Sequence, residues 1–300
     1  MDQLDSFKLE LGQSSEIAMA LTLATMMFSV ALGLRAEHFA FFQTQPRIYF
    51  GGVFAQLVML PLVTLLLCFV FEPSPTIALG MILISCCPGG NVSNLLVLLA
   101  RGNTALSVSL TATSSVAAAF ITPISILFWS ALYPPTNELL TRISFNAGDF
   151  LVQTSVILAL PLFVGMAVAH WLPRIAGAIQ RPLVFVSSLG LLAIIVTTTA
   201  RYLDQFSLIG WTFYALIVFH NGVAFALGFI TAKIVRADRP STRALTFEVG
   251  IQNSGLGIVI LLTQLGGMGG AAAVAGLWGI WHIVAGLILV SVFRYTEAKH

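Results

Sequence analysis

One carboxylate, Glu248, lies well inside an apolar stretch, about five residues beyond Arg243. The other acidic residues, of the twelve in the chain, lie in polar segments or near the ends of apolar stretches. At bilayer depth a carboxylate costs several kcal/mol unless it is paired, and by default it marks an ion pathway. Because no Lys or Arg lies within another apolar stretch, the predicted counter-charge is a proton or a metal cation. The alternative interpretation is a glutamate near the inner interface whose side chain reaches water.

Two apolar stretches are interrupted by small and polar residues. The stretch 77–100 contains Cys87-Pro88-Gly89-Gly90-Asn91-Val92-Ser93-Asn94, and the stretch 244–265 contains Gly250-Ile251-Gln252-Asn253-Ser254-Gly255. Proline lacks a backbone N–H and the two glycines after it favour irregular backbone, so we expect the first helix to break there. Lipid cannot satisfy the freed N–H and C=O groups, so such a break must be buried in protein or line a polar cavity. The first break is therefore predicted to form half of a binding site for an ion and a solute.

A row of hydroxyl side chains follows the first break. Four of them have helical i, i+3, i+4 spacing and would form one stripe: Thr104, Ser107, Thr111 and Ser114. The stripe either supplies oxygen atoms to a site or bonds carbonyls of its own helix, and spacing alone leaves both interpretations open. For Ser109 and Thr113, on the other faces, the second interpretation is favoured. Gln56 lies among apolar residues and is by itself most simply an interhelical hydrogen-bonding residue.

The candidate groups are all oxygen donors, namely hydroxyls, amides, carbonyls freed by helix breaks and one carboxylate. Hard cations prefer oxygen, and a mostly neutral shell with a single carboxylate suits a monovalent ion such as Na⁺. A carboxylate–histidine relay would favour protons instead, and His220 and His282 are the histidines in the middle of apolar stretches. The three cysteines lie in apolar runs without metal-ligand spacing, so we expect them to be packing residues.

Composition excludes an ordinary soluble domain. The chain is 58% hydrophobic and 9% charged, whereas soluble domains carry about 25% charged residues. A polytopic membrane protein of the all-α class is therefore expected. The sequence has no basic tail and no interleaving of basic and aromatic residues, so nucleic acid is not an expected partner. Residues 1–16 carry four acidic residues against one lysine, and no cleavage site follows, so we expect no signal peptide.

Nine stretches are long enough to cross about 30 Å of hydrocarbon. They are residues 17–34, 48–71, 77–100, 104–132, 150–171, 183–200, 208–232, 244–265 and 271–293. With the N-terminus outside, every basic residue except Lys8, Arg142 and Arg201 falls in an inner segment, as the positive-inside rule requires. The predicted protein is thus a multi-pass protein of the cell inner (plasma) membrane, with 1–16 as an N-terminal periplasmic segment and 294–300 as a cytoplasmic tail. Because one interrupted stretch lies in each half of the chain, we also predict inverted repeats of four and five helices.

The motifs around these residues resemble the bile acid:sodium symporter family. The resemblance is carried by Cys86 to Asn94, by Ala100-Arg101-Gly102-Asn103-Thr104-Ala105-Leu106-Ser107 and by Glu248 to Gly255, and it covers nearly the whole chain. It implies a panel domain, 17–34 and 150–200, and a core domain, 48–132 and 208–293, in which the two discontinuous helices cross. The expected nine helices match the animal members, whereas ten-span bacterial members have an extra first helix.

The resemblance also implies two sodium sites and an organic-anion pocket. One sodium site would use Ser93, Asn94, Ser107, Thr111 and Glu248. The other would use Gln56, Glu248, Gln252 and the backbone carbonyls of Val249 and Ile251. The anion would bind between panel and core at Asn91, Asn253, Ser254 and His282. Some bacterial relatives have Asn after the Trp-His pair, whereas Ile283 stands here, which leaves the solute open.

The expected function is Na⁺-driven symport of an organic anion, such as a bile-acid-like or small carboxylate solute, by alternating access, and not enzyme catalysis. The closest alternative is the same architecture driven by protons, with Glu248 as the proton carrier. An intramembrane hydrolase would need Ser93 with His282, and no Gly-x-Ser-x-Gly or His-Glu-x-x-His motif supports it. A receptor or scaffold would not explain two broken helices and a lone carboxylate. The oligomeric state cannot be predicted from the sequence.

Overall fold

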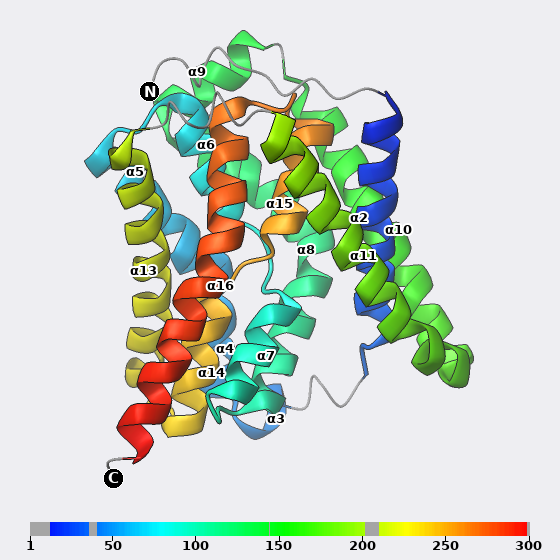
Figure 1. Ribbon diagram of the computed structural model, residues 1–300, viewed down its shortest axis with the longest axis vertical. Helices are drawn as coiled ribbons and strands as arrows, with labels where there is room; N and C mark the ends of the chain where they lie inside the picture. Colours follow the sequence, from blue (N-terminus) through cyan, green and yellow to red (C-terminus); the bar gives the residue numbers. More distant parts are fainter. Residues whose placement is uncertain (1–12, 36–40, 144, 202–209, 299–300) are drawn as a thin grey trace.

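The computed structural model describes residues 13–35, 41–143, 145–201 and 210–298, and within them the regular structure is helical (Figure 1). The chain order begins α2 Gln13–Leu32, α3 Phe41–Thr44, α4 Pro46–Phe54, η2 Ala55–Met59, α5 Leu60–Phe71, α6 Pro75–Ser85, α7 Asn91–Leu99 and α8 Thr104–Leu132. It continues with α9 Pro134–Arg142, α10 Ala147–Trp171, α11 Pro173–Arg201, α13 Trp211–Ile234, α14 Arg239–Gly250, α15 Ser254–Gln264 and α16 Gly269–Ala298. The predicted all-α class is confirmed.

In the described part of the chain, six helical segments are long and apolar enough to cross a membrane: Pro46–Phe71, Thr104–Leu132, Ala147–Trp171, Pro173–Ala193, Trp211–Ile234 and Gly269–Glu297. Shorter apolar helices cover Ile17–Leu32, Pro75–Ser85 and Ser254–Gln264. The chain is therefore a multi-pass membrane protein. The count of nine crossings stays a prediction, because each interrupted stretch consists of two short helices.

Some predicted boundaries were wrong. The stretch predicted at 183–200 begins ten residues earlier, at Pro173, because α11 continues through Gln180 and Arg181 and accommodates Pro182 in its interior. α16 extends to Ala298, so the helix continues into the segment 294–300, whose assignment as a cytoplasmic tail stays a prediction. Of the predicted periplasmic segment 1–16, residues 1–12 lie outside the described residues.

Both interrupted stretches break where the sequence predicts. α6 ends at Ser85 and α7 begins at Asn91, whereas α14 ends at Gly250 and α15 begins at Ser254. The two breaks touch, since Gly89 and Gln252 form an antiparallel bridge and the Asn253 N–H donates to Pro88 O at 2.8 Å. The broken helices run in opposite directions through the molecule (Figure 1). Each break thus satisfies part of the other's freed backbone, as burial in a membrane protein requires.

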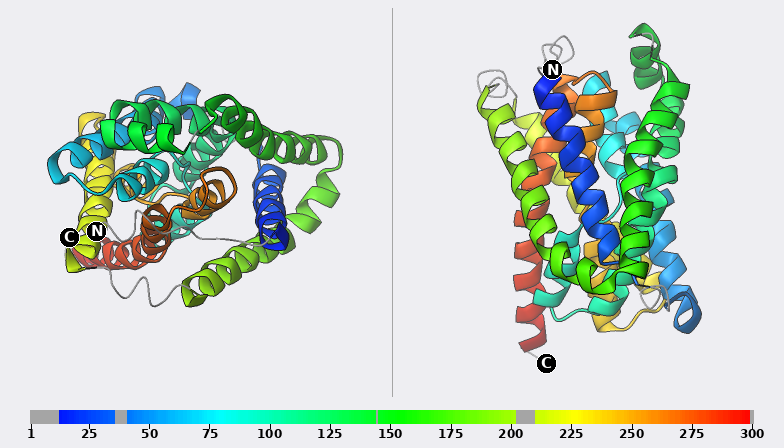
Figure 2. Two further views of the ribbon diagram at one scale, coloured as in Figure 1. Left: turned by 90° about the horizontal axis from the view of Figure 1, so that it is seen from above. Right: turned by 90° about the vertical axis from the view of Figure 1, so that its right-hand side faces the viewer.

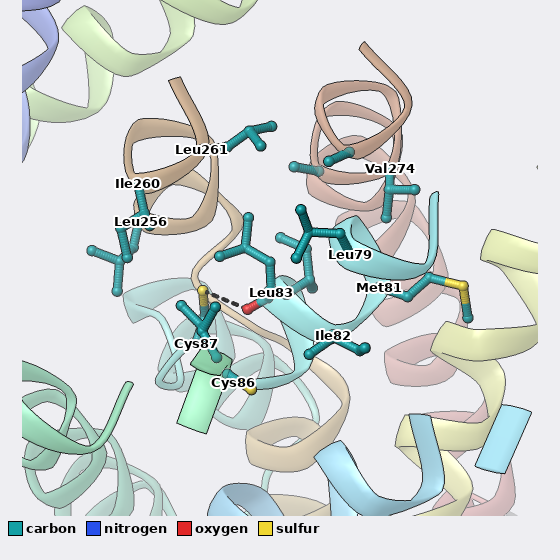
Figure 3. Packing of buried hydrophobic residues seen from close by; sticks show 14 of the residues in the cluster. Leu79, Met81, Ile82, Leu83, Cys86, Cys87, Leu256, Ile260, Leu261 and Val274 are labelled. Atoms are coloured by element: carbon teal, nitrogen blue, oxygen red, sulfur yellow. Dashed lines mark hydrogen bonds between the residues drawn. The ribbon is translucent and has the colours of Figure 1, made fainter. Parts of the chain in front are cut away.

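The remaining helices surround this crossing. α2, α10 and α11 pack against one another and form one side of the molecule (Figures 1 and 2). On the other side of the crossing, Leu79 and Leu83 of α6 lie among apolar side chains of α15 and α16 (Figure 3). Cys87 donates from Sγ to Leu83 O at 3.3 Å, and the three cysteines are buried and unbridged, as expected for packing residues. The crossing is therefore packed within an apolar core to which α2 and α10 also contribute buried residues.

Candidate functional site

The carboxylate of Glu248 is 1% exposed and receives hydroxyl hydrogen bonds from two other helices. Ser93 of α7 donates to Oε1 at 2.6 Å, and Ser107 of α8 also donates to Oε1 in a short hydrogen bond. Thr111, one turn after Ser107, donates to Oε2 at 2.9 Å and lies 3.1 Å from Oε1. Asn94 completes the cluster, because its Oδ1 accepts from Ser107 at 2.7 Å. The structure thus brings the residues of the first predicted sodium site together around one carboxylate.

This cluster contains more acceptor positions than protons. Each hydroxyl carries a single proton, yet Ser107 and Thr111 each lie within hydrogen-bond distance of both Glu248 and Asn94 Oδ1. Ser93 is similarly shared between Glu248 Oε1 and Gly90 O at 2.8 Å. A proton on Glu248 would add one donor, whereas a metal cation would be bound by several lone pairs at once. The donor set consists of oxygen atoms and therefore fits a hard cation.

Local sequence explains how each side chain reaches the cluster. Ser107 and Thr111 are four residues apart and share one face of α8. Ser93 and Asn94 lie in the first turn of α7, where the break brings the helix start next to α14. Ser114, one turn further along α8, accepts from the Gly89 N–H at 3.3 Å and so satisfies a backbone group of the break.

The other hydroxyls of α8 behave differently. Thr104 makes no described hydrogen bond to this cluster. Of the predicted stripe, only the part from Ser107 onward therefore contacts the Glu248 cluster or the break. Thr113 donates to Ser109 O, four residues back, at 2.8 Å, as expected for a hydroxyl on another face. Thr113 also forms a short hydrogen bond with the Tyr49 hydroxyl.

Gln56 lies on the opposite side of the same carboxylate. Its Nε2 donates to the backbone carbonyl of Glu248 at 3.3 Å. A Cβ added to Gly89 would lie 2.9 Å from Glu248 Oε2 and 3.0 Å from Gln56 Nε2, so a side chain at this position would displace the ends of these two side chains. Gln56 itself lies in a π-helical turn, Ala55–Met59, of the kind often found at functional sites.

At the break between α14 and α15, the buried amide oxygen of Gln252, a residue of the second predicted sodium site, has no donor within the described residues, and neither has Asn221 Oδ1. The amide nitrogen of Gln252 donates to Val249 O at 2.9 Å, and that of Asn221 donates to Gly250 O at 2.8 Å. An unpartnered buried acceptor is costly, and a cation bound here would satisfy it. The residues of the second predicted sodium site therefore also fit a cation.

The residues predicted to contact the solute do not all lie together. Asn91, at the start of α7, is exposed and lines a cavity of about 240 Å³. Asn253 caps α15, since its Oδ1 accepts from Leu256 N–H at 3.1 Å. Ser254 lies against α16, where a Cβ on Gly279 would be 2.7 Å from its Oγ. His282 is buried, and its Nδ1 has no partner in the described chain. None of these last three lines the cavity, so their role stays a prediction.

The cavity lies between α2 and α11 on one side and α7 and α8 on the other. Its polar lining comes from the two sides of the molecule: Ser29 and Gln180, and Asn91, Asn94 and Thr111. It therefore adjoins the Glu248 cluster, because Asn94 and Thr111 belong to both. Among the described residues, its lining contains neither Lys nor Arg.

Sequence reasoning missed Ser29, Gln180 and Asn221. Gln180 lay between the predicted stretches 150–171 and 183–200, whereas α11 includes it, and its helical register would have been the available signal. Asn221 follows His220 in the middle of an apolar stretch and could have been selected by the same rule as Glu248. Ser29 carries no signal, because single serines are common in membrane helices.

His220 does not take part in a relay with Glu248. Its Nε2 lies 2.7 Å from Thr64 Oγ1, and its ring packs edge-on against Trp278 with centroids 4.6 Å apart. The described residues also contain no group of three or more His, Cys, Asp or Glu side chains that could hold a metal ion. The arrangement thus favours oxygen coordination of a hard ion over transition-metal binding.

Comparison with known proteins agrees with this geometry. The sequence profile of the Sodium Bile acid symporter family matches residues 20–220. The uncharacterized sodium-dependent transporter YocS of Bacillus subtilis (strain 168) is 32% identical over 238 residues, which are 79% of this chain and 71% of that protein.

Two eukaryotic relatives are also similar. The probable chloroplastic sodium/metabolite cotransporter BASS1 of Arabidopsis thaliana is 28% identical over 85% of this chain and 61% of its own length. The ileal sodium/bile acid cotransporter of Homo sapiens is 27% identical over 79% of this chain and 67% of its own length. The matched regions thus span about 61% to 71% of these relatives.

Proposed function

Because the chain belongs to the sodium bile acid symporter family, we propose that it is a sodium-coupled symporter that moves an organic anion across the cell membrane by alternating access. The family and the relatives are sodium-dependent transporters and not enzymes. Ser93 donates to Glu248, which also leaves a Ser93–His282 hydrolytic pair without geometric support.

The observation that supports sodium coupling is the convergence of α7, α8 and α14 on Glu248. Na⁺ bound between Ser93, Asn94, Ser107, Thr111 and Glu248 would satisfy the lone pairs that the three hydroxyl protons cannot. It would also tie the three helices together, because each contributes at least one ligand. Binding of sodium would therefore favour one arrangement of the core over others.

We place a second ion at Gln56, Glu248, Gln252 and the carbonyls of Val249 and Ile251. The unpartnered Gln252 Oε1 supports this site. Since Glu248 would serve both ions, the two sites share their negative charge. Two Na⁺ with one monovalent anion carry a net charge of +1, so an inside-negative membrane potential would contribute about 2.3 kcal/mol per 100 mV to uptake.

The proposed solute site is the cavity between the α2, α10 and α11 group, which we assign as the panel domain, and the core. An anion there would meet neutral amide and hydroxyl groups and the start of α7, where the helix dipole and free N–H groups favour negative charge. Bound Na⁺ next to Asn94 and Thr111 would add positive charge at the cavity wall. Because no lysine or arginine side chain lines the cavity among the described residues, the bound Na⁺ would supply the positive charge that the anion needs, and solute binding would therefore depend on sodium. Rocking of the core against the panel would then expose the cavity to either side.

Uptake into proteoliposomes tests the proposal. A panel of radiolabelled organic acids is offered with inward gradients of NaCl or KCl, and separately with a pH gradient in KCl. We expect accumulation of at least one acid with the Na⁺ gradient alone. Glu248→Gln should abolish it, because the amide removes the charge and adds donors where acceptors are needed. Glu138→Gln, an exposed residue whose carboxylate pairs with Arg142 at 3.5 Å, is the matched control and should transport normally.

Three results would contradict the proposal. Accumulation that survives replacement of Na⁺ by K⁺ would remove sodium coupling. Accumulation driven by the pH gradient in K⁺ would favour the proton-coupled alternative, with Glu248 as the proton carrier. Normal transport by Glu248→Gln would show that the oxygen cluster is not the coupling site. With the predicted orientation, N-terminus outside and C-terminus cytoplasmic, the first turn of α14 lies at the cytoplasmic face of the membrane.

A further inference from the structure

A second cavity, of about 260 Å³, has no lining residue in common with the Glu248 cluster. The helix ends that line it lie at the end of the molecule that carries the C-terminus (Figure 1). It is formed by the last turns of α13, the first turns of α14 and the end of α16. Its charged lining consists of Lys233, Arg239, Arg243 and Glu297. Three cations against one carboxylate leave the lining with a net charge of +2.

Arg243 is the buried member of this set, with 7% of its surface exposed. Its Nη1 donates to Ala100 O at 2.7 Å and to Arg101 O at 3.3 Å, at the end of α7, and lies 3.3 Å from Glu297 Oε2. Its Nε and Nη2 have no hydrogen-bond partner among the described residues. Both atoms also keep some exposed surface, since neither is among the unpartnered polar atoms that are completely buried. One edge of the guanidinium therefore remains for a ligand in the cavity, with the parallel N–H geometry that suits phosphate.

The other two cations carry no ion pair in the part of the chain that the structure describes. Lys233 Nζ lies 5.0 Å from the centroid of the Phe229 ring, and Arg243 Cζ lies 5.7 Å from that of Phe293, so aromatic rings form two walls of the cavity. Asp238, next to Arg239 in sequence, accepts from the Ser241 N–H at 3.0 Å and caps α14. The helix start is thus already satisfied, and anion binding here would rest on the basic side chains.

The position of the cavity along the helices matters for its ligand. The apolar segment of α13 ends at Ile234, and that of α16 reaches Glu297. Ile230 and Ile234 are 52% and 67% exposed beside the cavity's Lys233. The basic groups therefore lie where a membrane helix leaves the hydrocarbon, at the level of phospholipid headgroups, with apolar surface directly adjacent. Basic pockets in this position attract anionic lipids.

We propose that this cavity is a binding site for a phosphate-bearing anion, either the headgroup of an anionic phospholipid or a soluble phosphate. The anion would contact Lys233, Arg239 and the free edge of Arg243. Arg243 joins the end of α7 to α14 and α16, and it lies on the same helix as Glu248. Ligand bound at the cavity would therefore hold together the helices that carry Ser93, Asn94 and Glu248. The site requires only that the protein is embedded in a membrane, so it stands independently of the transported solute.

Thermal unfolding of the full-length protein in detergent tests the site. The probes are dihexanoyl phosphatidylglycerol, dihexanoyl phosphatidylcholine and inorganic phosphate, at constant ionic strength. We expect phosphatidylglycerol to raise the unfolding midpoint in a saturable way, and phosphatidylcholine to raise it less. In Lys233→Gln/Arg239→Gln the half-saturating concentration should rise about thirtyfold, because each basic residue near an anionic lipid contributes about fivefold.

The matched control is Arg236→Gln/Arg294→Gln, which removes two basic residues near the same end of the molecule that do not line the cavity. It should respond like the unmodified protein. If inorganic phosphate reproduces the shift and loses it in the same double variant, the ligand is a soluble phosphate; if phosphatidylglycerol alone acts, it is a lipid. No saturable shift with either anionic probe, or equal losses in the two double variants, would overturn the site. The single variants Lys233→Gln and Arg239→Gln, each expected to weaken binding about fivefold, give the same test if the double variant does not fold.

Discussion

At the level of single residues, Ser107 and Ser109 offer a direct comparison. Both are buried on α8, at 0% and 1% exposure, but Ser107 donates to Glu248 and Asn94, whereas Ser109 has no hydroxyl contact with either. We predict that Ser107→Ala raises the Na⁺ concentration for half-maximal uptake about tenfold or more, since hydrogen bonds to a charged group are worth about 1.5 to 3 kcal/mol. Ser109→Ala should leave it unchanged. Equal effects in a sodium titration of uptake would show that Ser107 acts through packing alone.

Asn253 allows capping to be separated from solute binding. Its Oδ1 caps α15, while its Nδ2 has no hydrogen-bond partner among the described residues. Serine at this position keeps an oxygen acceptor for the cap but removes the amide donor. Asn253 does not line the cavity, and its solute contact is what the family resemblance implies. On that expectation Asn253→Ser should retain the unfolding midpoint but raise the KM for the solute severalfold, whereas Asn253→Ala should also lose about 1 kcal/mol of stability. An unchanged KM in Asn253→Ser would restrict Asn253 to a capping role.

The residues that sequence could predict are those with a strong local signal. Glu248 is a carboxylate at bilayer depth, and Ser107 and Thr111 have the spacing of one helix face. Gln180 gave no such signal, because its importance comes from α11 lying across the cavity from α7. The unpartnered oxygen of Asn221 likewise depends on where the broken end of α14 passes α13. Such residues become visible only when helices distant in sequence are placed side by side.

At the level of elements, the contact between the two breaks depends on Gly89. Its N–H donates to Ser114, its bridge partner is Gln252, and a Cβ would enter the space between Glu248 Oε2 and Gln56 Nε2. We predict that Gly89→Ala abolishes sodium-dependent uptake and lowers the unfolding midpoint, because the neighbouring groups must shift by several tenths of an ångström.

Gly222 is the control for this substitution, since it lies in the interior of α13 and a Cβ there has no neighbour within 4 Å. Gly222→Ala should transport normally and gain about 0.5 to 1 kcal/mol of stability from helix propensity. Uptake by Gly89→Ala equal to that of Gly222→Ala would show that the tight passage at the crossing is not needed for sodium coupling.

Sequence predicted the breaks themselves because proline, paired glycines and clustered amides are poor membrane-helix residues. It did not predict the π-helical turn around Gln56, because Ala55-Gln56-Leu57-Val58-Met59 contains no helix-breaking residue. The start of α11 was also misplaced, since the predicted stretch began at residue 183 whereas the helix begins at Pro173 and continues through Pro182.

At the level of the whole molecule, the proposed mechanism requires the cavity between the α2, α10 and α11 group and the rest to admit the solute. Val184 of α11 lines this cavity, whereas Val186, two residues later, is 59% exposed on another face of the same helix. A tryptophan at position 184 would occupy much of the cavity volume of about 240 Å³. We therefore predict that Val184→Trp lowers solute uptake at least about tenfold, and that Val186→Trp transports normally, because interfacial and lipid-facing tryptophans are tolerated.

Sodium binding provides the second measurement for this pair. The oxygen atoms around Glu248 come from α7, α8 and α14, and none comes from α11. Stabilisation of the protein by Na⁺, measured as the rise in unfolding midpoint when NaCl replaces KCl, should therefore persist in Val184→Trp while uptake is lost. Loss of both would mean that the cavity and the ion cluster cannot be perturbed separately. Retention of both would place the solute pathway elsewhere in the molecule, and the division into a panel that lines the solute cavity and a core that binds the ions would then be wrong.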